Sequence, residues 1–293
     1  MTESPRFPPY VALLVSIVAV STASIMIRMS DAPPLAIATY RLTLATLIVA
    51  PFYVRSGGPA RLMSAGRRDQ LTLAGVGVAL ALHFASWITS LGYTSVASSV
   101  IFVHVDPIFV AAVSHFVLGE KVRRSTLQGI TVAFIGAAVI AFSDSGSGGS
   151  SLYGDLLALV GALMLGVYIL SGRRLRQSLD LVSYVTPVYA TSAVVLALSC
   201  VATGTRLWPY PAEEYALLLA IAVVPMIFGH TVYNWALKYI EASVVSISLL
   251  GEPVGATLLA YFFLGETPPY LTLVGGAITL LGIYWCAKNN SGN

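Results

Sequence analysis

The chain has 293 residues, of which 57% are apolar and 10% are charged, and its formal net charge is +3. A soluble domain carries about 25% charged residues, so this composition excludes a soluble globular protein. The small positive charge lies in connecting segments and does not indicate nucleic-acid binding. Long uncharged runs match the ~20 residues that span a bilayer as a helix, and the short alternating segments of a membrane β-barrel are absent. We predict an all-α integral membrane protein.

Hydropathy predicts ten transmembrane helices along the chain. The first follows Arg6 and is too long for a signal peptide, so we interpret it as a membrane span. A basic, glycine-containing segment at 55–69 is predicted to be a loop, and 144–151 (DSGSGGSS) a flexible linker. The predicted helices cover 9–28, 34–54, 70–91, 94–118, 125–143, 152–172, 180–203, 212–237, 242–264 and 269–287. The linker therefore separates two five-helix units at 1–143 and 152–293.

The second unit repeats the first. Residues 91–136 align without a gap with residues 237–282, at an offset of 237 − 91 = 146. Asp106-Pro107 aligns with Glu252-Pro253, and the LGE at 118–120 aligns with the LGE at 264–266. An offset of about half the chain indicates duplication of a whole multi-helix unit.

Charge placement predicts that the two units are inverted relative to each other. Thirteen of the 16 Lys and Arg residues fall on one side of the predicted spans, which the positive-inside rule assigns to the cytoplasm. The basic 121–124 loop aligns with the uncharged 267–270 loop, as expected if matching loops face opposite sides. Both termini are then predicted to be cytoplasmic.

Inverted repeats are typical of secondary transporters, whose sites lie near the bilayer midplane at interrupted helices. Pro107 and Pro253 fall in the middle of predicted spans, where each removes an amide donor and disturbs the carbonyl four residues earlier. We predict a hinge at each proline. A plain kink and a break that faces the ligand remain the alternatives.

The repeated Asp/Glu-Pro and LGE pattern, followed by a glycine-containing apolar helix, resembles the EamA-type repeat of the drug/metabolite transporter superfamily. Arg41 within the second helix is also similar to that family. The resemblance covers essentially the whole chain and implies ten helices in a bacterial inner membrane. Size and layout are similar to the bacterial exporters of aromatic amino acids. Asp106 departs from the Glu of the pattern.

Polar side chains at mid-membrane depth mark a candidate pathway, because a charge there costs about 2.5–3.5 kcal/mol and faces protein or water. On a continuous helix Ser95, Ser99, Phe102 and Asp106 share one face, with His104 opposite and interpreted as structural. Mixed polar and aromatic faces suit an amphiphilic substrate, and interhelical hydrogen bonding with packing is the alternative. The predicted pathway residues are His83, Trp87, Ser95, Ser99, Phe102, Asp106, Tyr168, His230, Tyr233, Asn234, Ser248 and Glu252.

Two roles remain open for Asp106 and Glu252. Either carboxylate is a cavity group, with proton binding as one function, or it is structural, as a pair with Arg41 or as a protonated acid bonded to the carbonyls that the proline frees. The glycine-containing helices at 125–143 and 269–287 are predicted to pack as a pair, with a homodimer contact as a further role. We expect no cofactor or metal, since the two cysteines lack ligand spacing and no Walker motif is present.

The favoured hypothesis is a transporter that exports small amphiphilic metabolites, especially amino acids including aromatic ones, by alternating access. The alternative is a proton-coupled exporter of drugs or other metabolites. An intramembrane enzyme is disfavoured because neither HExxH nor GxSxG occurs. A receptor or assembly subunit does not explain the inversion. The small-molecule substrate and the lipid bilayer are thus the expected partners.

Overall fold

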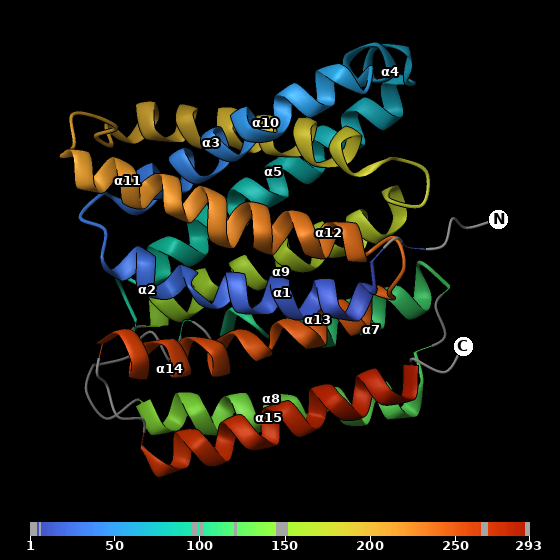
Figure 1. Cartoon of the computed structure of the whole chain (residues 1–293), viewed down its shortest axis with the longest axis vertical. Helices are drawn as coiled ribbons and strands as arrows, with labels where there is room; N and C mark the ends of the chain where they lie inside the picture. Colours follow the sequence, from blue (N-terminus) through green and yellow to red (C-terminus); the bar gives the residue numbers. More distant parts are fainter. Residues whose placement is uncertain are drawn as a thin grey trace.

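The computed structural model describes residues 5, 7–94, 99, 102–119, 122–144, 152–264 and 269–290. These residues form a layered bundle of roughly aligned helices (Figure 1). The helices are α1 (Pro9–Ser21), α2 (Ala23–Arg28), α3 (Pro34–Arg55), α4 (Gly58–Ser64), α5 (Arg67–Ser90), α7 (Asp106–Phe116), α8 (Arg124–Asp144), α9 (Leu152–Leu175), α10 (Leu181–Thr203), α11 (Ala212–Ile221), the π-helix η2 (Ala222–Thr231), α12 (Val232–Ala236), α13 (Ala242–Leu249), α14 (Gly251–Leu264) and α15 (Tyr270–Asn290).

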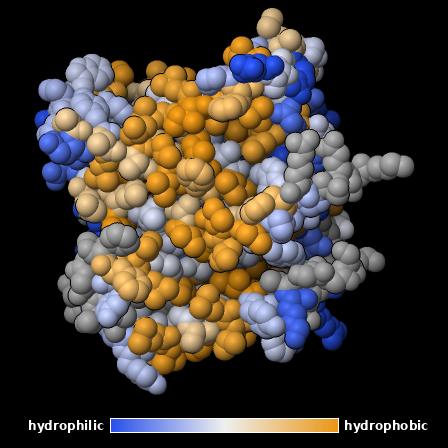
Figure 2. Space-filling view, viewed as in Figure 1, coloured by the Kyte–Doolittle hydropathy of each residue, from blue (hydrophilic) through white to orange (hydrophobic). Residues whose placement is uncertain are grey.

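The surface of the bundle is that of a membrane protein. Apolar residues cover the middle of the face in Figure 2, and hydrophilic residues gather at its left and right edges. Six stretches of described residues are each long and apolar enough to span a bilayer by length and composition: 9–28, 34–55, 67–90, 152–175, 181–203 and 212–236. Large apolar side chains such as Leu14, Leu47 and Leu198 are exposed, as expected for lipid-facing positions.

The structure departs from the predicted helices at three places. The 55–69 segment is not simply a loop, because it contains the short helix α4 with Pro59 in its first turn. The first span is interrupted at Thr22, whose hydroxyl donates to the carbonyl of Ala19 at 2.7 Å. The 212–237 span contains the π-helix η2, which includes Pro225. Prolines and π-turns both displace the regular hydrogen-bond ladder, so carbonyls become available to side chains.

The two halves run in opposite directions. In Figure 1, α1 starts at the right and runs left, whereas α9, which opens the second half, runs from left to right. The pairs α3 and α10, and α8 and α15, are opposed in the same way. As a result α1 begins and α15 ends at the same edge of the molecule. The predicted fold class, an all-α membrane protein built from two inverted repeats, is confirmed.

The first helix of each half packs against the other half. Helix α1 contacts η2, α12 and α14, while α9 contacts α5 and α7. Ser16 on α1 donates to the carbonyl of Gly229 at 3.0 Å, and His83 on α5 contacts the carbonyl of Gly161 on α9 at 2.9 Å. Under the 146-residue offset Gly229 is the equivalent of His83, and Ser16 is the equivalent of Ala162, the neighbour of Gly161. The two contacts therefore occupy corresponding places to within one residue. The halves are therefore interlaced around the centre of the molecule.

Helices α8 and α15 pack as the predicted pair at one end of the bundle (Figure 1). Their backbones approach so closely that a methyl group at Gly136 would lie 2.6 Å from the carbonyl oxygen of Gly275. One at Gly282 would lie 2.7 Å from that of Gly129. Glycines at a crossing permit this approach, as is common between membrane helices. The predicted homodimer contact through these helices stays a prediction.

Candidate functional site

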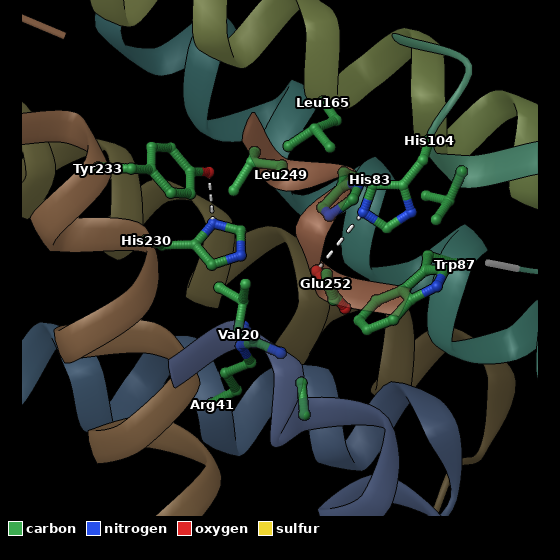
Figure 3. Close-up of a pocket in the computed structure, with 12 residues that line it drawn as sticks. Val20, Arg41, His83, Trp87, His104, Leu165, His230, Tyr233, Leu249 and Glu252 are labelled. Atoms are coloured by element: carbon green, nitrogen blue, oxygen red, sulfur yellow. Dashed lines mark hydrogen bonds and ion pairs between the residues drawn. The ribbon is translucent and has the colours of Figure 1, made fainter. Parts of the chain in front are cut away.

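A small cavity lies where the two halves meet, and side chains from both halves line it (Figure 3). Its volume of about 20 Å³ is room for roughly one water molecule, since a buried water needs about 10–15 Å³. As it stands, this cavity is too small for a metabolite. The lining residues of this central cavity are Val20, Ala23, Arg41, His83, Trp87, Val103, His104, Leu165, His230, Tyr233, Leu249 and Glu252.

The central cavity lies on the approximate two-fold axis of the repeat. Trp87 and Tyr233 are related by the 146-residue offset, and both line it. Val103 and Leu249 form a second related pair in the lining. A site built from equivalent positions of inverted halves is typical of secondary transporters.

Two histidines form part of the wall. Because a carbonyl oxygen only accepts, His83 Nδ1 is the donor to Gly161, which leaves Nε2 as an acceptor in the neutral ring. The His83 ring stacks parallel to Trp87, with 6.1 Å between centroids. On the opposite wall His230 Nδ1 lies 2.6 Å from the hydroxyl of Tyr233 (Figure 3). These contacts fix the rings in place and leave a mixed aromatic and polar surface.

A histidine and a carboxylate meet in the wall of the central cavity. Glu252 Oε2 lies 3.5 Å from His104 Nε2, and both side chains are largely buried. His104 belongs to the turn before α7, and Glu252 to the first turn of α14. The pair thus joins the interrupted segments of both halves across the central cavity (Figure 3).

Arg41 enters from α3 and is 1% exposed. Its guanidinium carbon lies 4.3 Å above the ring of Phe84, and Nη2 donates to the carbonyl of Pro225 in η2 at 3.3 Å. Among the residues that the structure describes, Nε and Nη1 have no hydrogen-bond partner. The proline and the π-helical turn thus bring a carbonyl oxygen within hydrogen-bond distance of Arg41. Most of the N–H donors of Arg41 have no partner among the described residues.

Five of the predicted pathway residues line the central cavity: His83, Trp87, His230, Tyr233 and Glu252. Six others do not. Ser99 contacts Ser90 at 2.6 Å, and Ser248 donates to the carbonyl of Val244 within its own helix at 2.7 Å. The remaining four are Phe102, which is half-buried, Asp106, which accepts from Ser246, and Tyr168 and Asn234, which bond to each other at 2.7 Å. Ser95 lies outside the described residues.

The shared face predicted for Ser99, Phe102 and Asp106 does not hold, because the helix is interrupted. Residues 104 and 105 form a turn, and α7 begins at Asp106. The interruption breaks the regular 100° step between residues, so Asp106 points to α13 and His104 faces the central cavity. His104, which the sequence analysis places opposite Asp106 and interprets as structural, thus lines the central cavity. The proline that follows was the available signal, since a proline disturbs the preceding turn.

Both predicted interruptions lie just before their prolines. Pro107 is the second residue of α7, and Pro253 is the third residue of α14, directly after α13 ends at Leu249. The breaks occur in the same register of each half. Their predicted role as hinges stays a prediction.

Two opposed, interlaced helical halves that span a membrane and share a polar cavity define a protein of the membrane-transporter class. The chain belongs to the EamA-like transporter family, whose profile matches residues 8–142 and 152–287. It is thus a multi-pass transporter rather than an enzyme. Among the described residues, no group of His, Cys, Asp or Glu could hold a metal ion.

Relatives of known sequence extend over most of the chain. An uncharacterised transporter from Archaeoglobus fulgidus is 26% identical over 275 residues, which is 93% of each chain. A pseudopaline exporter, CntI, from Pseudomonas aeruginosa is 25% identical and covers 89% of this chain and 88% of its own. A probable terminal-alkyne amino-acid exporter from Streptantibioticus cattleyicolor is 28% identical over 61% of this chain and 60% of its own.

A solved structure described as a crystal structure of a protein shares the fold. Its TM-score is 0.82 at 17% sequence identity, and the similarity covers 98% of this chain and all of that one. At this identity the likeness concerns the fold alone.

Proposed function

We propose that this chain exports small amphiphilic metabolites, above all amino acids including aromatic ones, from the bacterial cytoplasm across the inner membrane. The observation that carries this proposal is the central cavity, which combines aromatic walls with a buried cation and a buried carboxylate. Aromatic walls suit an apolar side chain, and groups of both signs suit a zwitterion. The exporters of amino-acid-like compounds among the relatives support this cargo.

The proposed mechanism is alternating access across the approximate two-fold axis. A cavity with room for about one water must enlarge before it admits a metabolite. The interruptions before Pro107 and Pro253 lie beside the lining residues Val103 and Leu249, so movement there would open the central cavity to either side. Inverted halves make the two open states near-equivalent in structure.

The proposed orientation places both termini in the cytoplasm. The end of α3 and the helix α4 lie on the same edge as the start of α1 and the end of α15 (Figure 1). They carry Arg55 and Arg61, which the positive-inside rule favours on a cytoplasmic face. A bacterial inner membrane is the location proposed for this arrangement.

A second candidate is a proton-coupled exporter of drugs or other metabolites. One observation favours it: Glu252 lines the central cavity in contact with His104, and both groups can exchange protons. The equivalent carboxylate, Asp106, is 1% exposed and does not line the cavity.

Overexpression in cells challenged with toxic amino-acid analogues tests the cargo. We expect resistance to aromatic analogues, and none in cells making an equal amount of a variant with Trp87→Ala and Tyr233→Ala. No protection against any analogue, with protein present in the membrane, removes amino acids as the cargo. Flux into proteoliposomes with and without a pH gradient then separates the two candidates, because only the second requires the gradient.

A further inference from the structure

The central cavity contains a buried guanidinium, that of Arg41, most of whose N–H donors have no hydrogen-bond partner among the described residues. A guanidinium has five N–H donors, and within the described part of the chain only Nη2 has a hydrogen bond, to the Pro225 carbonyl. No described carboxylate lies within 4.0 Å of Arg41. A buried charge is costly unless it is paired and hydrogen-bonded. Arg41 is 1% exposed and lines the cavity, so its unused donors indicate a place for an anionic group.

The nearby carboxylates are engaged with other partners. Glu252 pairs with His104 at 3.5 Å, and Asp106 accepts a hydrogen bond from Ser246. The central cavity therefore has a cationic pole at Arg41 and a separate anionic pole at Glu252. Figure 3 shows Arg41 beside Val20 on one wall, with Glu252 beside Trp87 on another.

We propose that Arg41 binds the carboxylate of a zwitterionic α-amino acid, while Glu252 and the face of Trp87 receive its ammonium group. This inference rests on the proposed function and names the head-group recognition that the function leaves open. Hydrogen bonds between a guanidinium and a carboxylate are charge-assisted, and an aromatic face attracts an ammonium group. The side chain of the amino acid then packs among Leu165, Leu249 and Tyr233.

The guanidinium of Arg41 also donates to η2, so substrate binding at Arg41 is coupled to the π-helical segment. Pro225 offers one weak acceptor at 3.3 Å, whereas a carboxylate offers two charged oxygens. A substrate carboxylate thus either replaces the hydrogen bond from Arg41 to Pro225 or binds Arg41 alongside it. The residue that recognises the head group therefore lies at a contact between the two halves, that of α3 with η2.

The test compares three probes on the purified full-length protein: L-phenylalanine, L-phenylalaninamide, which lacks the carboxylate, and 3-phenylpropionate, which lacks the ammonium. We expect the wild type to bind phenylalanine about tenfold or more tightly than the amide. Arg41→Gln should weaken phenylalanine binding by a similar factor and abolish the preference for acid over amide. Glu252→Gln should weaken phenylalanine binding but not 3-phenylpropionate binding.

Arg28→Gln is the matched control, because Arg28 is exposed at the end of α2, and it should bind all three probes as the wild type does. Arg41→Lys keeps the charge and should retain part of the acid preference if Arg41→Gln fails to fold. Retention of the full acid preference in Arg41→Gln overturns the inference and leaves the proposed function standing. Equal binding of acid and amide by the wild type also overturns it. Binding of none of the probes removes both the aromatic cargo and the inference.

Discussion

Asp106 and Glu252 occupy equivalent places in the two halves but different environments. Glu252 lines the central cavity and contacts His104, whereas Asp106 is buried against Ser246 of α13. The duplicated sequence therefore supplies two carboxylates in different surroundings. Under the proposed function Asp106 stabilises the packing of α7 against α13, while Glu252 contacts the substrate.

This difference leads to a prediction about two isosteric substitutions. Glu252→Gln should lower amino-acid flux in proteoliposomes at least tenfold, because it removes the anionic pole of the central cavity. Asp106→Asn should keep flux within a few-fold, because the amide oxygen still accepts from Ser246. Equal losses in both variants, at matched protein content, would show that the central cavity is not the substrate site.

At the residue scale, part of the site could be predicted from the sequence. Polar residues inside apolar spans were sufficient to select His83, Trp87, His230, Tyr233 and Glu252, all of which line the central cavity. The direction of side chains beside a helix interruption was not predictable, because the turn changes the angle at which the next helix begins. For Arg41 the family resemblance was noted, but nothing in the sequence showed that most of its donors stay unpaired.

Among the elements, the loop between α9 and α10 is held by the N-cap of α10. Asp180 accepts from the backbone N–H of Ser183 at 3.0 Å and from its hydroxyl at 2.8 Å, and it pairs with Arg61 of α4 at 2.6 Å. Burial acts to raise the pKa of Asp180, but the bonds from Ser183 and the charge of Arg61 outweigh it. The pKa of this carboxyl therefore lies below its usual value of 3.8.

A depressed pKa makes the contribution of this cap to stability depend on pH. It is present above the unfolded-state pKa and lost as pH falls through the folded-state pKa. Asp180→Ala should lower the unfolding free energy of the purified protein by about 0.5–2 kcal/mol at neutral pH. The difference from wild type should narrow below pH 3.8. Ser178→Ala, at an exposed neighbour, is the control, and a pH-independent deficit for Asp180→Ala would contradict the assignment.

A second prediction at this scale concerns the close packing of α8 against α15. Gly136→Ala should destabilise the protein by about 1–3 kcal/mol in thermal unfolding, because the methyl group meets the backbone of Gly275 and cannot displace it. Gly75→Ala is the matched control on α5, where nothing lies within 4 Å. It should be neutral or stabilising by up to ~1 kcal/mol, since alanine favours the helix. Similar behaviour of both variants would mean that the close packing is absent.

Helix positions followed from hydropathy, and the glycine-containing pair followed from composition. The π-helical form of η2 did not, because Pro225 predicts only a disturbance of the helix and not the kind of helix that results. In the structure η2 packs against α1 and accepts a hydrogen bond from Arg41. The short helix α4 was hidden by the charged and glycine-containing character of its segment. Local pattern thus located the elements, while tertiary contacts set their interruptions.

At the scale of the whole molecule, the inversion followed from the repeat and the loop charges. The interlacing did not, since sequence identity between repeats says nothing about which half a helix contacts. Because α1 packs on η2 and α14, and α9 packs on α5 and α7, rigid bodies that move against each other must mix helices of both halves. Rocking of two intact five-helix halves, the simplest mechanism suggested by the repeat, requires breaking these contacts.

Interlacing also predicts how a divided chain behaves. A chain cut within the proposed linker at 144–151 should transport when both parts are made together, since the cut removes no described contact between helices. Either part alone should give no flux, because each supplies only part of the central cavity lining. Co-purification of the two parts and proteoliposome flux are the measurements. Flux from a single part would contradict a site shared between the halves.

The distance along the chain between α1 and its neighbours constrains biosynthesis. Ser16 bonds to Gly229, 213 residues later, whereas Ser21 bonds to Ile17 within its own turn. The local bond can form as soon as the first span leaves the ribosome, but Ser16 must wait until most of the protein has been translated. Until then the first span rests against lipid or the insertion machinery. A photocrosslinker at position 16 in stalled nascent chains should capture those neighbours until η2 emerges.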